Sequence, residues 1–321
     1  MDRDFDRIDT PAIPDRSENS RPFSGERLHH GHDQAPARDD DKAHAQNAER
    51  KDSSKLPEAQ ERRERLIPER QREIGRIGRR TYNLSQSERE TLADIGRFRV
   101  IRLDDLALYR YSGRAPELTR DLRKINRQAL VEKKTVWTGR NREQVTFVAL
   151  TKAGKAYLKR ADDGIPQQAI YAGFVKPAEL RHDAAIYPMF HKEAARIASE
   201  GGRVGRVILD YELKKKAYSP LAKAKALPPD QYAKRQAEIA QANGLKVVNG
   251  HIALPDLRIE YITREGTAAS VDLELATESY HGSHAAEKAG AGFKIYAASQ
   301  TAARLSAALE EREITAEILS L

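Results

Sequence analysis

Hydrophobic residues between positions 85 and 158 follow two spacings in succession, and this change limits the folds open to that part of the chain. Up to Ala129 they recur every three or four residues, which is the period of an amphipathic helix. Two β-rich segments follow, 131–138 and 143–150, joined by the turn Gly139-Arg140-Asn141. A closing helix begins at Thr151. The order predicts three helices, a two-stranded hairpin and a last helix.

Local signals place the three helices. Ser85 and Glu88 have the capping-box spacing, and Asp104 is expected to cap the second helix. The third helix is expected over about 115–129, with a core stripe made of Leu118, Leu122, Ile125 and Ala129. This arrangement resembles a winged helix-turn-helix, as does the ending LTKAGKAYL, and we predict that fold over residues 81–162.

Cationic side chains occupy the side of the third helix opposite its core stripe and the tip of the hairpin. They are Arg114, Arg120, Arg123, Lys124, Arg127, Arg140 and Arg142. Arginine on such a helix can contact guanine edges or phosphates in the major groove, so we predict that these residues bind double-stranded DNA. Two alternatives remain open: the cations only solubilise a surface helix, or the fold serves protein contacts. Trp137 is expected to pack the hairpin onto the core, the alternative being stacking on a nucleotide.

The net charge of +8, from 56 basic and 48 acidic residues, is unevenly distributed. Residues 81–160 carry 18 basic and 9 acidic side chains, and residues 201–250 carry 10 and 4. Residues 251–321 reverse the balance, with 6 basic and 11 acidic. The basic blocks fit a polyanionic partner. The absence of cysteine excludes disulfides, thiolate metal sites and cysteine nucleophiles.

The N-terminal segment has almost no apolar clusters. Residues 1–80 are expected to form a disordered tail and a basic linker, because a segment of this kind cannot bury enough surface to offset its ordering entropy. Within it, 58–80 is either a solvated linker or a transient basic helix that Pro68 interrupts. No apolar run is long enough for a membrane span and the N-terminus lacks a secretory pattern, so a cytoplasmic protein is expected.

Residues 175–321 are expected to form a second domain with a mixed α/β sheet, which makes the fold class α+β. The expected elements are a helix over 179–200 kinked or split at Pro188, a strand over 204–213, a basic loop over 214–227, a helix over 229–243, a hairpin over 246–263, a strand over 270–275, a mostly helical segment over 284–309 and a tail over 314–321.

Three acids in this domain suggest a metal site. Asp256 follows Pro255 in one predicted strand, and Asp272 and Glu274 lie two apart on the next, so those two share a face. Three converging carboxylates repel one another unless a divalent cation binds, and oxygen ligands favour Mg²⁺ or Mn²⁺. Such an ion activates water or polarises a phosphodiester. The alternative is a polar strand face in contact with water.

Short motifs in this order resemble the replication-relaxation family and the plasmid mobilisation relaxases built on a restriction-endonuclease-like core. The motifs are the winged helix, His182-Asp183-x-Ala185, Asp210-Tyr211-Glu212-Leu213, Pro255-Asp256, Val271-Asp272-Leu273-Glu274-Leu275 and Thr277-Glu278, covering roughly residues 84–300. The resemblance implies a restriction-endonuclease-like C-terminal domain that nicks one DNA strand at a transfer or replication origin with a metal ion. It also implies single-stranded DNA at the origin, relaxosome or secretion-system proteins and a homodimer as partners, and association with plasmid or nucleoid.

The resemblance assigns roles to particular residues. Asp256, Asp272 and Glu274 match the metal-binding acids, and His182 matches a histidine that is a metal ligand, a proton shuttle or a helix cap. Ala276 stands where a further acid or a lysine is expected. Other side chains considered for the site are Glu278, Lys288 and Lys294 as substitutes for that residue, Glu193 as a further ligand, and Tyr280 and Tyr296 as attacking hydroxyls.

Two rival functions remain open. The departure at Ala276 favours a non-catalytic DNA-binding regulator or replication initiator with a degenerate nuclease domain. An adaptor that recruits replication or secretion proteins through the N-terminal tail is the other. His281 and His284 have a spacing that also suits a metal, whereas His29, His30 and His32 are interpreted as unstructured.

Overall fold

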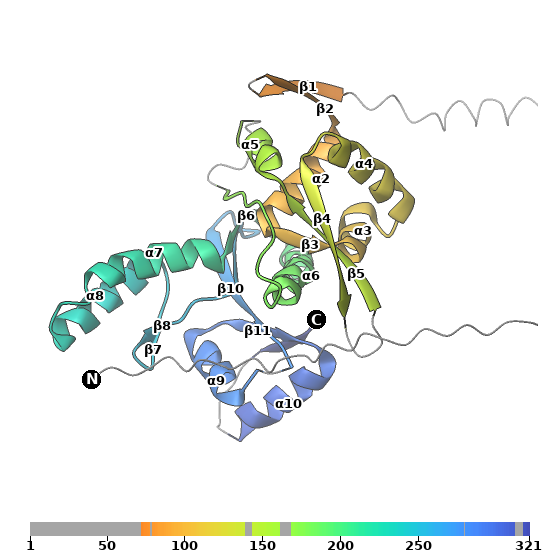
Figure 1. Ribbon diagram of the computed structural model, residues 1–321. Coiled ribbons are helices and arrows are strands. Elements are labelled where there is room, and N and C mark those ends of the chain that lie inside the picture. Colours follow the sequence, from red (N-terminus) through yellow and green to blue (C-terminus); the bar gives the residue numbers. More distant parts are fainter. Residues whose placement is uncertain (1–71, 78, 139–142, 161–167, 279, 312–316) are drawn as a thin grey trace, which may run out of the picture. The chain divides into compact units, whose positions relative to one another are not determined.

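The structure is a computed structural model, and it describes residues 72–77, 79–138, 143–160, 168–278, 280–311 and 317–321 (Figure 1). Every described residue belongs to one compact unit, which lies within Glu64–Leu321. The predictions for residues 1–71, which include the tail and its histidines, and for the hairpin tip with Arg140 and Arg142 lie outside the described residues.

A hairpin precedes the first helix. Strand β1 (Arg72–Ile77) pairs antiparallel with β2 (Arg80–Ser85) along its whole length. The transient helix considered for 58–80 is therefore wrong for 72–77. The reason lies in β2, where Tyr82 and Leu84 are buried in the core. Their alternation gives this segment a strand period and fixes it against the rest of the unit.

Four helices in the first half follow the predicted order: α2 (Gln86–Phe98), α3 (Leu103–Tyr111), α4 (Ala115–Arg127) and α5 (Lys152–Arg160). The capping box at the start of α2 is confirmed, with Ser85 and Glu88 each accepting a hydrogen bond from the other's backbone N–H. Asp104 does not cap α3, because the helix begins one residue earlier, and it pairs with Arg102 instead. Helix α4 ends at Arg127, so Ala129 lies beyond it.

The two strands predicted over 131–138 and 143–150 are confirmed with the same bounds. Strands β4 (Val131–Thr138) and β5 (Glu143–Leu150) pair antiparallel. A short strand, β3 (Val100–Arg102), adds to the other edge of β5 and completes a three-stranded sheet of order β3-β5-β4. Four successive residues at the end of β5 are buried, which joins the sheet to the core beneath the helices.

A mixed five-stranded sheet forms the centre of the second half, with strand order β12-β11-β10-β9-β6. Its strands are β6 (Arg203–Leu209), β9 (Leu257–Ile262), β10 (Ala268–Ala276), β11 (Lys294–Ala297) and β12 (Ile318–Ser320). Strand β9 runs antiparallel to β6 and β10, whereas β10, β11 and β12 are parallel. The chain is thus of the mixed α+β class, as predicted.

Helices cover both faces of this sheet (Figure 1). Helix α6 (Leu180–Ser199) packs against the face that carries Leu273, Leu275 and Tyr296. Helices α9 (Gly282–Ala291) and α10 (Ser299–Glu310) pack against the opposite face. Because successive residues of a strand point to opposite faces, this division decides which charged side chains can meet.

A helical hairpin follows β6. Helices α7 (Asp210–Lys223) and α8 (Pro229–Ala242) pack on each other and on the short ribbon of β7 (Val247–Val248) and β8 (His251–Ile252). The strand predicted over 204–213 ends early, and the loop predicted over 214–227 is mostly helix. Leu213, Ala217 and Leu221 explain the difference, because they form a stripe at a spacing of four that is buried in a separate small core.

Three further predictions need correction. Helix α6 is not split at Pro188, because the neighbouring Tyr187 and Met189 are fully buried and fix the helix in the core. Residues 294–297, predicted as helical, form β11, and residues 318–320 of the predicted tail form β12. A loop at 253–256 interrupts the strand predicted over 251–263.

One hydrophobic core extends through both halves of the unit. The buried cluster runs from α2 and α4 through α6 to the central strands of the five-stranded sheet. At its centre the Tyr187 ring lies 5.0 Å from that of Phe98 and near those of Tyr109 and His191. Helix α6 therefore lies between the two sheets and places its N-terminal residues beside the end of the second one.

Candidate functional site

Several charged side chains meet at one end of the five-stranded sheet, where β6 and β10 end and where β9 and α6 begin. Strand β6 ends at Leu209 and β10 ends at Ala276, and β9 begins beside them at Leu257. Leu257 is paired with both Leu209 and Leu273, so these three ends lie at one edge of the sheet. The N-terminal turn of α6 lies at the same edge. We call this group, which comprises His182, Asp183, Asp210, Tyr211, Asp256, Glu274, Tyr280 and Lys288, the strand-end site.

His182 joins two carboxylates of the strand-end site. Its Nδ1 lies 3.3 Å from Asp183 Oδ1, and its Nε2 lies 3.3 Å from Asp256 Oδ2. The hydrogen bond with Asp183 and then that with Asp256 raise the pKa of His182 to about 10, against the effect of burial. The imidazole is therefore protonated at neutral pH, since both ring nitrogens must carry a proton to donate to two acids.

Asp183 receives a second donor from the start of α7. The Tyr211 hydroxyl donates to Asp183 Oδ2, and the Arg99 guanidinium lies over the Tyr211 ring, 4.2 Å from its centroid. Burial, and then the hydrogen bond with Asp183, raise the pKa of Tyr211. The histidine is thus held by a carboxylate that is itself fixed by the next element along the chain.

Glu274 carries the most perturbed carboxyl of the strand-end site. Tyr280 Oη donates to its Oε1 at 2.9 Å and Lys288 Nζ donates to its Oε2 at 2.9 Å. Burial raises the pKa of Glu274 to about 7, the Asp256 charge adds to the rise, and Lys288 opposes it.

Lys288 is fixed from two sides. Besides its contact with Glu274, its Nζ donates to the Leu254 carbonyl at 2.6 Å, in the loop that leads to Asp256. One turn before it in α9, Ala285 packs in the cluster that contains Ala276 of β10. The small side chain at 276, where a lysine or acid was expected, lets α9 approach the strand. The ammonium group then comes from α9 instead.

Asp256 and Asp210 complete the strand-end site. Asp256 Oδ2 accepts a hydrogen bond from the Leu275 N–H at 2.9 Å, and the Asp256 carbonyl accepts one from the Asp210 N–H. Asp210 pairs with Lys214 one turn further along α7. Burial raises the pKa of Asp210, which Lys214 counteracts and the Asp256 charge reinforces. Asp256 is therefore in contact with the protonated His182, and its negative charge raises the pKa of both Asp210 and Glu274.

Asp272 does not join these acids, which corrects the predicted set of three carboxylates. Arg258 of β9 binds Asp272 with two hydrogen bonds, Nε to Oδ1 at 2.6 Å and Nη2 to Oδ2 at 2.8 Å. The same guanidinium donates to the carbonyls of Asn243 and Gly244 at the end of α8. Arg258 is the residue directly opposite Asp272 in the β9–β10 pairing, and it donates to both carboxylate oxygens.

Lys294 and Tyr296 lie on the wrong face of the sheet for the strand-end site. Both belong to β11, where Lys294 Nζ is 3.5 Å from Glu193 Oε1 and Tyr296 Oη donates to Glu193 Oε2 at 2.7 Å. Glu193 is fully buried in α6, on the opposite side from α9. The predicted parts of Lys294 and Glu193 in the site, and the attack by Tyr296, are therefore wrong.

A ready-made metal cluster is not present in the part of the chain that the structure describes. No group of three or more histidine, aspartate and glutamate side chains there has the arrangement that could hold a metal ion. His281 and His284 have their ring centroids 6.3 Å apart and both are exposed. Of the three predicted ligands, Asp256 and Glu274 lie at the same strand end, where Asp256 Oδ2 accepts from the N–H of Leu275, and Asp272 is bound by Arg258.

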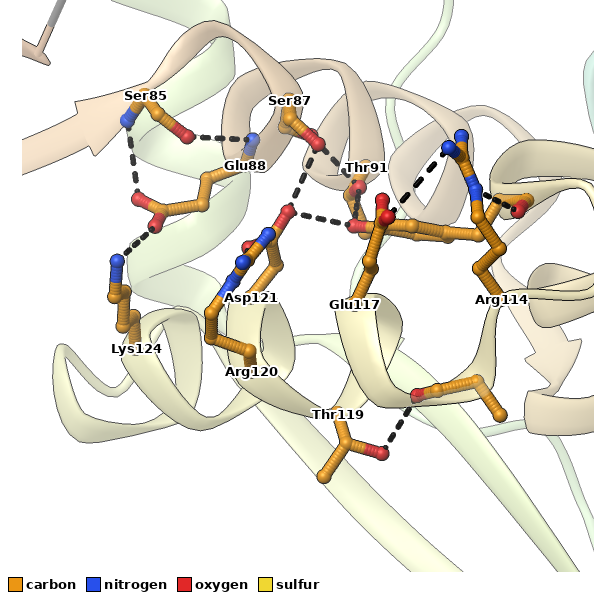
Figure 2. A network of polar contacts seen from close by, with 12 residues as sticks. Ser85, Ser87, Glu88, Thr91, Arg114, Glu117, Thr119, Arg120, Asp121 and Lys124 are labelled. Atoms are coloured by element: carbon orange, nitrogen blue, oxygen red, sulfur yellow. Dashed lines mark hydrogen bonds and ion pairs between the residues drawn. The ribbon is translucent and has the colours of Figure 1, made fainter. Parts of the chain in front are cut away.

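Two buried carboxylates, Glu88 of α2 and Asp121 of α4, link these two helices (Figure 2). Glu88 is fully buried, and Lys124 Nζ approaches its Oε1 at 3.8 Å. Asp121 is also buried; it accepts a hydrogen bond from Ser87 and lies 3.3 Å from Arg120 Nε. Two of the predicted DNA-binding cations, Arg120 and Lys124, are therefore partly neutralised by buried acids.

The remaining cations of α4 differ among themselves. Arg114 Nη1 lies 3.5 Å from Glu117 Oε1, and the arginine remains exposed. Arg123 and Arg127 are exposed, and no ion pair of the described residues engages them. Trp137, on β4, is 68% exposed, so its predicted packing onto the core is wrong. Exposed cations and an exposed indole thus belong to the same half of the unit.

The sequence predicts no function for Asp183, Asp210 and Tyr211, although they belong to two of the motifs that resemble the relaxase families. The signal for Asp210 is its place immediately after the buried run Val207–Leu209, where the strand ends. A strand predicted to continue to 213 hides that signal. Asp183 follows His182 in the chain, but only its contacts with Tyr211 show that it orients the histidine.

Comparison of the chain with protein-family models, with curated proteins and with solved structures gives no match. Its own geometry must therefore carry any conclusion about function. Among the described residues, no helix is long and apolar enough to cross a membrane.

Proposed function

We propose that this chain is a mobilisation or relaxation protein of a mobile element, which binds double-stranded DNA and nicks one strand at a transfer or replication origin. In this proposal, residues 81–162 form a winged helix-turn-helix and residues 175–321 form a restriction-endonuclease-like nuclease domain. The observation that carries it is the placement of Lys288 on Glu274 and on the loop before Asp256. This placement supplies the cation that the sequence motif lacks at Ala276.

The surface of α4 supports the DNA-binding part of the proposal. The helix buries Leu118, Leu122 and Ile125 and exposes Arg123 and Arg127. A helix fixed to a core along one side, with exposed arginines on the other, suits insertion into the major groove. Arg120 and Lys124 are bound by buried acids, so Arg123 and Arg127 are the stronger candidates for DNA contact.

Asp256 and Glu274 are the residues that would hold Mg²⁺ or Mn²⁺. The fit rests on their donor chemistry: both are carboxylates of like charge, which repel each other, and Lys288 Nζ contacts both Glu274 and the Leu254 carbonyl two residues before Asp256. A bound divalent ion would relieve this repulsion, and it would supply Lewis-acid activation of the phosphodiester or of water. Asp272 is not part of this set.

The chain's own residues have separate tasks in this proposal. Lys288 presents a positive charge beside Glu274, where it can stabilise negative charge that develops on a phosphate. The protonated His182 orients Asp256, and Tyr280 orients Glu274. All of these groups lie at the carboxyl ends of β6 and β10, which is a common position for active sites of α/β proteins.

A specific observation favours the rival function. Both oxygens of Glu274 already have partners in the chain, and Arg258 occupies Asp272. A site whose acids are satisfied internally is also what a non-catalytic DNA-binding regulator or replication initiator would retain. The two functions differ in one measurable result, which is strand cleavage.

A nicking assay on supercoiled plasmid that carries the cognate origin tests the proposal. With Mg²⁺ or Mn²⁺ present, the wild-type protein should convert the plasmid to the relaxed form. Glu274→Gln and Lys288→Met should each lower this rate by at least about a hundredfold, which is typical for loss of one electrostatic catalytic group. Glu265→Gln is the matched control, because Glu265 is exposed in the turn between β9 and β10. No nicking by the wild type would favour the non-catalytic alternative, and equal nicking by all variants would contradict the assignment of Glu274 and Lys288 to the catalytic site.

DNA binding is tested separately by titrating a labelled duplex in the absence of divalent metal. Arg123→Ala combined with Arg127→Ala should weaken binding and lower the slope of log K against log salt by about two, since each phosphate contact contributes roughly 0.9. Arg264→Ala, at the exposed β9–β10 turn, is the control. An unchanged slope for the double variant would contradict the assignment of α4.

A further inference from the structure

Helix α7 begins in the strand-end site and leads away from it, and its exposed side is rich in lysine. Asp210, the first residue of the helix, is bound to the backbone of Asp256. The 14 residues of α7 span about 21 Å, which equals the rise of roughly six base pairs of DNA. A duplex that is held at the strand-end site and follows α7 would therefore lie along this helix for roughly six base pairs.

Charge on this helical hairpin is concentrated in α7 and the turn after it. Residues 210–227 contain five lysines and two acids, whereas α8 has two cations and two acids. Two of the lysines, Lys214 and Lys216, are ion-paired with acids of the same helix. In the part of the chain that the structure describes, no ion pair engages the other three, Lys215, Lys223 and Lys225, and all three are exposed. Their charge remains available to a partner.

Two features beside these lysines suit a polyanion. Tyr218 lies between Lys215 and Lys223 in the chain and is 47% exposed, so its ring can pack on a sugar or a base. At the end of α7 a hollow of about 480 Å³ opens toward α8, and it has two cations in its wall. The residues that line it are Ser219, Pro220, Lys223, Ala224, Leu227 and Arg235.

The opposite side of α7 excludes a membrane surface as the partner. Leu213, Ala217 and Leu221 are buried in the small core shared with α8 and with the strand residues Ile208 and Ile252. An interfacial membrane helix needs its apolar side free to enter the lipid, and here that side is occupied. The free side has lysines with one aromatic ring, which is the composition of a surface that binds a phosphate backbone.

We propose that Lys215, Lys223 and Lys225, which we name the α7 lysine strip, bind the phosphate backbone of the DNA that enters or leaves the strand-end site. The inference rests on the proposed function, since it takes DNA as the substrate. It adds a second contact surface, separate from α4. The strip has no part in cleavage, and its task is to hold the DNA along α7.

The test uses the full-length protein and a fluorescently labelled duplex of about 30 base pairs, with EDTA present so that no cleavage occurs. Replacing all three lysines of the strip by glutamine should reduce the slope of log K against log salt by about 2.7, because each lost phosphate contact removes roughly 0.9. The control replaces three exposed lysines outside the strip by glutamine, Lys176, Lys234 and Lys246, which changes the net charge equally. The control slope should stay within about one unit of the wild type.

A second measurement uses the unmodified sequence and does not depend on the folding of a variant. Lysine acetylation of the wild-type protein, read by mass spectrometry with and without the duplex, should show DNA protecting the α7 lysine strip more strongly than Lys234 and Lys246. Equal slopes for the strip variant and the control variant, or equal acetylation with and without DNA, would overturn the proposal and direct attention to an acidic protein partner.

These results are separate from those of the nicking assay. A wild-type protein that fails to nick, but whose slope depends on the α7 lysine strip, contradicts the proposed nuclease and keeps the strip as a DNA-binding surface. If the wild type nicks DNA but the slope of log K against log salt does not depend on the α7 lysine strip, the proposed nuclease is supported and the strip is contradicted.

Discussion

Replacing Asp272 by asparagine distinguishes a structural carboxylate from a metal ligand. In the structure Asp272 compensates the Arg258 guanidinium, and the two side chains are only 16% and 9% exposed. Asp272→Asn keeps the shape of the side chain and removes its charge. The arginine is then buried beside carbonyl groups without its counter-ion, because its other hydrogen bonds go to Asn243 and Gly244.

The expected cost follows from this burial. Removing one partner of a buried ion pair costs roughly 3–5 kcal/mol, since the other charge remains desolvated. For a cooperative unit of this size such a loss lowers the Tm by roughly 10 °C. Calorimetry or a thermal melt followed by circular dichroism measures the shift directly. At a temperature where both proteins are folded, the Asp272→Asn variant should nick plasmid at nearly the wild-type rate.

Glu274→Gln provides the opposite pattern. Burial raises the pKa of Glu274 to about 7, so the ionised acid is costly in the folded state and its replacement by the amide relieves that cost. The amide also removes the counter-ion of Lys288, which opposes the gain, so the Tm at pH 8 should fall less than in Asp272→Asn. The same change should abolish nicking. If instead Asp272→Asn left the Tm unchanged and eliminated metal-dependent nicking, Asp272 would be a metal ligand and the structural assignment would be refuted.

Two further outcomes concern stability. The pKa of His182 is raised to about 10 in the folded protein from 6.5, so the stability that the protonated histidine contributes is complete below pH 6.5 and declines as the pH rises toward 10. Urea unfolding should therefore show that His182→Gln destabilises the protein at pH 6 and has little effect at pH 10.5. Equal destabilisation at both pH values would contradict the protonated state of the histidine. A Cβ added at Gly154 would lie 2.1 Å from the Leu130 carbonyl oxygen, so Gly154→Ala should cost about 1–3 kcal/mol. Gly290→Ala in α9, where nothing lies within 4 Å of the added Cβ, should be neutral or stabilising, and a similar loss at both glycines would contradict the steric argument.

Elements governed by short-range chemistry could be predicted from the sequence. The capping box of Ser85 and Glu88 fixes the start of α2, and the β-rich composition of residues 131–138 and 143–150 predicts both strands of the hairpin. Helix α8 begins at Pro229, because proline is pre-organised for the first helical position. Asp256 and Glu274 were also identified in this way, since their types and spacing are visible in the chain itself.

The composition of the strand-end site was decided by tertiary structure. Asp272 and Glu274 lie two residues apart on one strand and look equivalent in the sequence. Only the register of β9 against β10 places Arg258 opposite Asp272 and takes it out of the site. Likewise Lys288 and Lys294 both follow β10, but Lys294 falls in an unpredicted strand and points to the α6 face.

The physical reason is the range of the interactions. Helix caps, turns and periodic stripes involve residues within a few positions of one another. The sequence by itself therefore determined the four helices and the β4–β5 hairpin of the first half, and the acidic character of residues 251–321. The pairing of β10 with β11, the burial of the Leu213 stripe that makes α7 a helix, and the approach of α9 at Ala276 depend on residues distant in the chain. Tertiary structure alone decided which acids meet Lys288 and which are paired elsewhere.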